Sequence, residues 1–261
     1  MKSFFIILVT IPFLIISAGA QAALHTETVE YKHGGTVLEG YLAYDDAFKG
    51  KRPGVMVVHE WWGLNDYIKG RAEQLAKLGY MAFAADMYGK GVHAKTAEEA
   101  GMLAGMFRSD RPLMRSRAKA GLDVLLAHQM TDAKRIAAIG YCFGGGVVLE
   151  LARSGSDIRG VVSFHGSLDN PNPEDAGNIK ADVLVLHGGA DPFVTPDQVL
   201  SFWKEMSRSN ADWEIDIYSG AVHSFTNPAS GSDPSKGVAY NEKADKKSWE
   251  AMKLFFSEIF K

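Results

Sequence analysis

The chain has 261 residues, of which 46% are hydrophobic, so it is long enough to bury one sizeable core. Its 28 basic and 31 acidic residues give a net charge of −3, which offers no reason to expect nucleic acid or an anionic membrane surface as a partner. Because Cys142 is the one cysteine of the sequence, an internal disulfide is excluded.

Residues 1–22 have the composition of an export signal. Lys2 precedes an apolar run, Phe4–Ile16, and the cleavage pattern Ala20-Gln21-Ala22 follows. We expect residues 23–261 to form a single domain that is periplasmic or secreted. An uncleaved anchor is the alternative, but the run is shorter than the ~20 residues that a helical span needs. No stable membrane association is expected after cleavage.

The first part of the expected domain predicts a hairpin and then a strand, helix, strand unit. The expected elements are strands Thr28–Lys32 and Thr36–Tyr44, a strand Gly54–His59, a helix from its cap Asn65 to Leu78, and a strand Met81–Ala85. A strand, helix, strand order joins two parallel strands of one sheet.

Helices and strands continue to alternate through the rest of the chain. They are helices Ala97–Phe107 and Pro112–Gln129, strand Ile136–Ile139, helix Phe143–Ala152, strands Gly160–Phe164 and Val183–Leu186, a helix from its cap Thr195 to Arg208, strand Trp213–Tyr218 and helix Val238–Phe260. This order predicts an α/β fold: a doubly wound, mostly parallel sheet with an N-terminal antiparallel hairpin and helices on both faces. Ligands of such sheets bind beyond the carboxyl ends of the strands.

The segment Gly140-Tyr141-Cys142-Phe143-Gly144 lies between an expected strand and an expected helix. It has the form Gly-x-nucleophile-x-Gly, in which glycines allow a tight turn that presents the middle side chain. A helix N-terminus favours a thiolate over a thiol and supplies a donor to an oxyanion. Cys142 is therefore a candidate nucleophile. The alternative is a small buried side chain that only packs.

A base and an acid are expected after the nucleophile, in the chain order nucleophile, acid, histidine. His223 lies just beyond the last expected strand, and Asp191 follows a strand whose next helix already has Thr195 as its cap. The alternatives are His165 and His187 for the base, and Asp169 and Asp197 for the acid.

Glu60 ends the first buried strand. A carboxylate beside the thiol would oppose thiolate formation unless it accepted the proton itself. Glu60 is therefore either a proton acceptor or a surface glutamate.

Together these residues resemble the dienelactone hydrolase family of α/β-hydrolases over nearly the whole expected domain. The segments that carry the resemblance are Val57–Asn65, Ala85–Tyr88, Gly140–Gly145, Gly188–Val194 and Val222–Phe225. The resemblance implies a triad of Cys142, Asp191 and His223. It also implies oxyanion donors at the backbone N–H groups of Phe143 and Trp61, and a resting thiol whose proton passes to Glu60.

The sequence departs from this family where substrate is bound. Members that cleave dienelactone resemble one another in two arginines that hold the substrate carboxylate, and this chain has Lys90 and Asn227 at those positions. An ester or lactone with a weaker acidic group, or none, is expected. Trp61, Trp62 and Tyr88 are expected to line an apolar pocket, with core packing as the alternative.

The favoured hypothesis is an exported hydrolase that cleaves an ester or lactone through a thioester on Cys142, without cofactor or metal. A non-catalytic binding protein on the same scaffold is one alternative. A thiol redox protein is weaker, because no second cysteine could resolve a sulfenate. A metal hydrolase that uses His59, His165, His187 and Asp191 is least favoured, because these residues lack a zinc-binding spacing.

Overall fold

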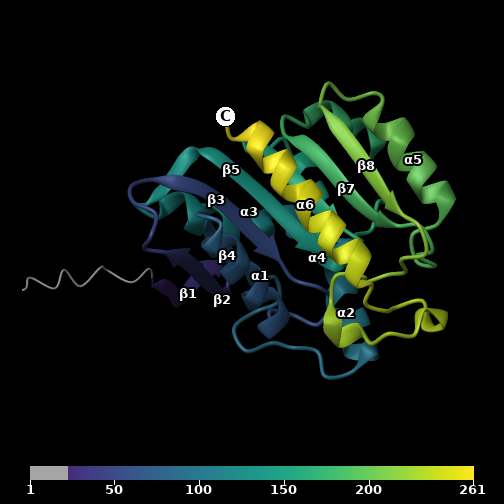
Figure 1. The fold of residues 1–261 in the computed structure, drawn as a ribbon, viewed down its shortest axis with the longest axis horizontal. Coiled ribbons are helices and arrows are strands. Elements are labelled where there is room, and N and C mark those ends of the chain that lie inside the picture. Colours follow the sequence, from purple (N-terminus) through teal and green to yellow (C-terminus); the bar gives the residue numbers. More distant parts are fainter. Residues whose placement is uncertain (1–22) are drawn as a thin grey trace, which may run out of the picture.

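The computed structural model describes residues 23–261, and the expected export signal lies outside this part of the chain. Within it, no helix combines the length and apolar character needed to cross a bilayer. The described residues form an eight-stranded sheet in the order β1-β2-β4-β3-β5-β6-β7-β8 (Figure 1). The strands are β1 Leu24–His33, β2 Thr36–Asp45, β3 Arg52–Val58, β4 Met81–Ala85, β5 Thr131–Tyr141, β6 Gly160–Phe164, β7 Asp182–Gly188 and β8 Trp213–Tyr218.

The N-terminal hairpin is confirmed. Strands β1 and β2 pair in antiparallel fashion around Gly34, and β2 joins the sheet antiparallel to β4. Every pairing from β4 to β8 is parallel. The central strands are buried on both faces, as their unbroken apolar runs predict. The carboxyl ends of β3, β5, β6, β7 and β8 therefore meet along one edge of the sheet.

Helices cover both faces, as expected. They are α1 Asp66–Lys77, α2 Ala97–Ser109, α3 Arg111–Ala127, α4 Phe143–Arg153, α5 Pro196–Met206 and α6 Glu242–Ile259. One apolar core holds α1 and α6 against the sheet, and α6 runs along that face as the yellow helix of Figure 1. A second core joins α2, α3, α4 and α5 to the opposite face. Every residue of α4 is buried, whereas each of the other five helices buries one apolar face.

The helix caps account for the helix boundaries. Asn65 accepts the backbone N–H of Ile68 at the start of α1, and Thr195 forms a capping box with Gln198 at the start of α5. The last helix was expected from Val238, and that start is wrong. Asn241 caps α6 instead, while Val238 pairs as a β-bridge with His223.

Candidate active site

Cys142 occupies the turn between β5 and α4, with a backbone φ of 54°. Neighbouring backbone approaches this turn closely on both sides. A Cβ atom at Gly140 would lie 2.0 Å from the carbonyl oxygen of Gly144, and one at Gly144 would lie 2.3 Å from that of Val58. Glycine is required at both positions, so the Gly-x-Cys-x-Gly pattern reflects close packing around Cys142.

The sulfur of Cys142 lies beside a histidine and an aspartate from distant parts of the chain. The Nε2 atom of His223 is 3.0 Å from Cys142 Sγ, and its Nδ1 atom is 2.8 Å from Oδ2 of Asp191. Asp191 follows β7 and His223 follows β8, so the shared carboxyl edge of the sheet brings all three together. This is the order and geometry of a nucleophile, base and orienting acid.

Charges within this group determine the state of its histidine. Burial by itself disfavours an imidazolium at His223, but the negative charges of Cys142 and Asp191 outweigh burial and raise the pKa of His223 to about 10. His223 therefore holds a proton once the thiol has lost one. The ring of His223 thus lies where its Nε2 atom can exchange a proton with the sulfur.

Asp191 has a second set of hydrogen bonds that holds it in place. Its side chain is fully buried, and its Oδ1 atom accepts the backbone N–H groups of Phe193 at 2.8 Å and Val194 at 3.3 Å. The aspartate thus closes its own turn with one oxygen and leaves the other for His223.

The two residues expected to supply oxyanion donors lie near Cys142: Phe143 follows it in the chain, and Trp61 lines the same cavity. Phe143 is the first residue of α4, where an N–H has no partner within the helix. Tyr88 donates its hydroxyl to the carbonyl oxygen of Trp61 at 3.0 Å, which holds the peptide between Trp61 and Trp62 in place. Tyr88 is buried against Phe143 and His59 instead of lining the pocket, so its expected contact with substrate is corrected to a supporting one.

Glu60 is buried, not a surface residue. Its two carboxylate oxygens accept the hydroxyl of Ser224 at 2.5 Å and the side-chain amide of Asn227 at 2.7 Å. Burial raises the pKa of Glu60, against the opposing effect of these two donors. Because the thiol pairs with His223 and both oxygens of Glu60 have other donors, this geometry favours His223 as the proton acceptor.

The two positions expected to bind a substrate carboxylate do not face the pocket. Lys90 forms ion pairs with Glu30 and Glu39 of the hairpin, at the side of the sheet away from His223. Asn227 is buried. Its side-chain amide donates to Glu60, and its side-chain carbonyl accepts the backbone N–H of Ala229. Both expectations are corrected, because nearer polar partners hold these side chains.

A cavity of about 440 Å³ opens over the sulfur. Its lining is Glu60, Trp61, Trp62, Arg108, Cys142, Ser167, Phe193, Val194, His223, Ser224, Ser230 and Val238. Trp62 lies where it was expected, beside Trp61. No local sequence pattern predicted Arg108, which comes from the last turn of α2, or Phe193, whose ring packs edge-on to His223 at 5.4 Å.

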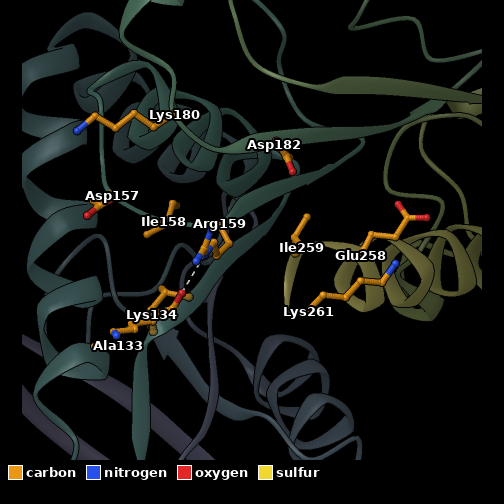
Figure 2. A pocket seen from close by; sticks show the side chains of 11 residues that line it. Ala133, Lys134, Asp157, Ile158, Arg159, Lys180, Asp182, Glu258, Ile259 and Lys261 are labelled. Carbon is orange, nitrogen blue, oxygen red and sulfur yellow. Dashed lines mark hydrogen bonds between the residues drawn. The ribbon is translucent and has the colours of Figure 1, made fainter.

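A second cavity, of about 560 Å³, lies where β5, β6 and β7 begin, at the other end of the sheet (Figure 2). Charged side chains surround it, among them Lys134, Arg159 and Asp182, and Arg159 Nε donates to the carbonyl oxygen of Lys134 at 3.0 Å. Among the described residues that line it there is no cysteine, serine or histidine. It therefore contains no nucleophile and base pair.

The other histidines that the sequence singled out are buried and apart from the sulfur. The ring nitrogens of His59 contact the carbonyl oxygen of Glu60 and the N–H of Met87. His165 contacts the backbone N–H of Cys142, and His187 lies on β7. In residues 23–261 no three His, Cys, Asp or Glu side chains converge as metal ligands would.

Known proteins share both this sequence and this fold. A family model described as "Dienelactone hydrolase family" matches residues 38–260. The protein usf of Aquifex pyrophilus is 30% identical over 237 residues, which cover 89% of this chain and 98% of usf.

Two solved structures are each 41% identical and cover 91% of this chain and 99% of their own. One, named m3DLH, superposes with a TM-score of 0.88. The other is described as the dienelactone hydrolase-like promiscuous phosphotriesterase P91 from metagenomic libraries, and its TM-score is 0.85. Because the family model matches the chain from within β2 to the end of α6, this chain belongs to the dienelactone hydrolase family of α/β-hydrolases.

Proposed function

We propose that this protein hydrolyses a carboxylic ester or lactone by nucleophilic attack of Cys142. The observation that carries the proposal is the line of contacts from Asp191 through His223 to the sulfur, at 2.8 and 3.0 Å, inside an open cavity. A binding protein would have no use for this alignment, and a redox thiol would need a resolving partner.

The reaction proceeds in two stages. His223 takes the thiol proton, and the thiolate attacks the carbonyl carbon of the substrate. The N–H groups of Phe143 and Trp61 donate to the oxyanion of the tetrahedral intermediate. The intermediate collapses to a thioester as the alcohol leaves with the proton of His223. Water, deprotonated by His223, then attacks the thioester, and the acid departs as the thiol is restored.

The cavity also indicates a class of substrate. Trp61, Trp62 and Phe193 give it an apolar wall, and Arg108 is the permanent cation among the described residues of its lining. We propose an ester or lactone with an apolar body and an acidic group that reaches Arg108. In this chain the guanidinium of Arg108 on α2 would then bind the acidic group of the substrate, in place of the two arginines of the members that cleave dienelactone.

The experiment is an assay of residues 23–261 against p-nitrophenyl acetate and butyrate. Replacement of Cys142 by Ala should lower kcat/KM by about 10³-fold or more, because the nucleophile is lost. The matched control is Lys180→Ala in the other cavity, which should match the wild type. Full activity in the Cys142 variant would end the mechanism, and an inert wild type on a broad ester panel would favour a binding role.

A second substrate class is favoured by the 41% identity to P91. We propose that phosphotriesters with a good leaving group also react. The thiolate attacks phosphorus, the aryloxide leaves, and water must then cleave the S–P bond. Paraoxon turnover that disappears in Cys142→Ala would support this activity. Labelling of Cys142 without turnover, or no reaction, would remove it.

Export remains a proposal that rests on Lys2, the apolar run Phe4–Ile16 and the cleavage pattern at Ala22. In the native host, fractionation followed by intact mass should find a chain that begins at Ala23 outside the cytosol. A cytosolic chain that retains Met1 would contradict it.

A further inference from the structure

Three non-glycine residues of the described chain have a positive φ: Cys142 at 54°, His165 at 40° and Ser224 at 57°. Such a conformation costs about 1–3 kcal/mol and persists only where surrounding contacts impose it. Cys142 is the proposed nucleophile, and Ser224 follows the proposed base and donates to Glu60. His165 is the third, and the mechanism above gives it no role.

His165 contacts both halves of the triad's framework. It is fully buried at the end of β6. Its Nδ1 atom accepts the backbone N–H of Cys142 at 3.2 Å, an N–H that is shared with the carbonyl oxygen of Phe164 at 3.0 Å. Its Nε2 atom lies 2.7 Å from Oγ1 of Thr226, in the same loop as His223. One imidazole thus joins the turn of the nucleophile to the loop of the base.

These contacts fix the protonation of the ring. A backbone N–H can only donate, so Nδ1 of His165 carries no proton, and Nε2 holds the proton that is donated to Thr226. Burial, and then the nearby charges of His223 and Arg71, lower the pKa of His165 well below its usual value. His165 therefore stays neutral beside the imidazolium of His223, whose ring centroid is 5.3 Å away.

The loop that His165 contacts is itself held firmly. Arg71 Nη2 donates to the carbonyl oxygen of Thr226 at 2.7 Å and pairs with Asp245 at 2.5 Å. Oγ1 of Thr226 also lies 2.6 Å from the hydroxyl of Tyr67 on α1. The imidazole of His165 therefore connects the turn at Cys142 to a loop that is itself held by Arg71 and Tyr67.

We propose that His165 is a positioning residue, which holds the turn of Cys142 against the His223 loop so that sulfur and imidazole stay in contact. Its effect on turnover rests on the proposed function. Its effect on the reactivity of the thiol does not, because alkylation of Cys142 requires no hydrolysis.

Three variants of His165 distinguish the loss of its hydrogen-bond acceptor for the Cys142 N–H from a loss of packing and from a relief of backbone strain. His165→Asn places an amide oxygen near the position of Nδ1 and tolerates a positive φ. His165→Gln reaches toward Thr226 but leaves the Cys142 N–H without its side-chain acceptor. His165→Gly relieves the strain and has no acceptor. Val162→Ala, a buried change on the same strand, controls for lost stability alone.

Two readouts apply: kcat and KM with a p-nitrophenyl ester, and the rate of iodoacetamide alkylation of Cys142 as a function of pH. We expect His165→Asn to keep kcat within about threefold, and the Gln and Gly variants to lose about 10–100-fold in kcat with little change in KM. Alkylation of Cys142 should be slower in both variants at every pH, because the sulfur is then no longer held against His223. The Val162 variant should keep both values.

The proposal would be overturned if all three His165 variants kept the kcat and the alkylation rate of the wild type. Equal losses in Asn and Gln would also overturn it, because packing would then explain the effect. Wild-type kcat in His165→Gly would also overturn the proposal, because the glycine variant has no acceptor and only relieves backbone strain. If the wild type hydrolyses no ester, the proposed function fails, while the alkylation profiles still decide the role of His165.

Discussion

The two ends of the sheet each carry a cavity of several hundred cubic ångströms, about 440 Å³ over Cys142 and about 560 Å³ beside Lys134 and Arg159. The larger one is lined by charged side chains, most of them exposed, from strands, a helix and the connecting segments. Around the smaller one, buried polar side chains are hydrogen-bonded to one another, as His223 is to Asp191. The backbone there has a positive φ at Cys142, His165 and Ser224. Volume does not distinguish them. The difference lies in polar groups that the fold holds at a cost in backbone strain.

The largest test of this comparison replaces an acid at each end. Asp191→Asn keeps an oxygen for the N–H groups of Phe193 and Val194, but it presents an amide to His223 and selects the wrong tautomer. We expect kcat to fall about 10²–10⁴-fold. Asp182→Asn, in the other cavity, should leave kcat unchanged. Similar kcat values for the two variants would show that the carboxylate beside Cys142 matters no more for turnover than the one in the other cavity.

A second prediction concerns packing around the turn between β5 and α4. Gly144→Ala puts a methyl group 2.3 Å from the carbonyl oxygen of Val58, where backbone must move, so we expect a loss of about 3 kcal/mol or more in unfolding free energy. Gly146→Ala, on the same helix, meets its nearest atom at 3.5 Å and should be neutral or stabilising by up to about 1 kcal/mol. Urea unfolding measures the unfolding free energy of both variants. Equal values would refute the close approach of the Val58 carbonyl to position 144.

Much of this framework follows from sequence, because local chemistry specifies it. Asn65 and Thr195 cap the helices that their side chains predict, and the glycines about Cys142 mark a turn that only they allow. The order of nucleophile, acid and histidine then predicts which side chains meet at the carboxyl edge, and Asp191 and His223 do lie there with the sulfur.

The parts that sequence did not predict depend on long-range contacts. Arg108 reaches the cavity from a helix whose placement no local pattern specifies. Lys90 and Asn227 have the right positions in the chain to meet substrate, yet Glu30 and Glu60 lie nearer. Val238 pairs with His223 instead of opening the last helix.

Arg108 provides the third test. Arg108→Gln should lower kcat/KM for the mono-p-nitrophenyl ester of glutaric acid about fivefold, because an exposed guanidinium and carboxylate pair contributes about 1 kcal/mol. The neutral p-nitrophenyl butyrate should be unaffected. Arg159→Gln at the other cavity should change neither rate. An equal loss on both esters in Arg108→Gln would argue for a structural role only.

The smallest effect is a pH dependence of stability. Because the pKa of His165 is lowered in the folded protein, the unfolded chain binds a proton that the folded protein excludes as the pH falls through 6.5. Between pH 7 and 5.5 the wild type should lose about 1 kcal/mol more of its unfolding free energy than His165→Asn does. Parallel curves for the two proteins would show that His165 takes up a proton in the folded state.

The most direct measurement of the account is the covalent state of Cys142 during turnover. An ester mixed with the enzyme and quenched in acid within milliseconds should add the mass of one acyl group, which peptide mapping places on Cys142. Cys142→Ala should add none. Turnover of the ester with an unmodified Cys142, or with the acyl group on another residue, would contradict the cysteine mechanism.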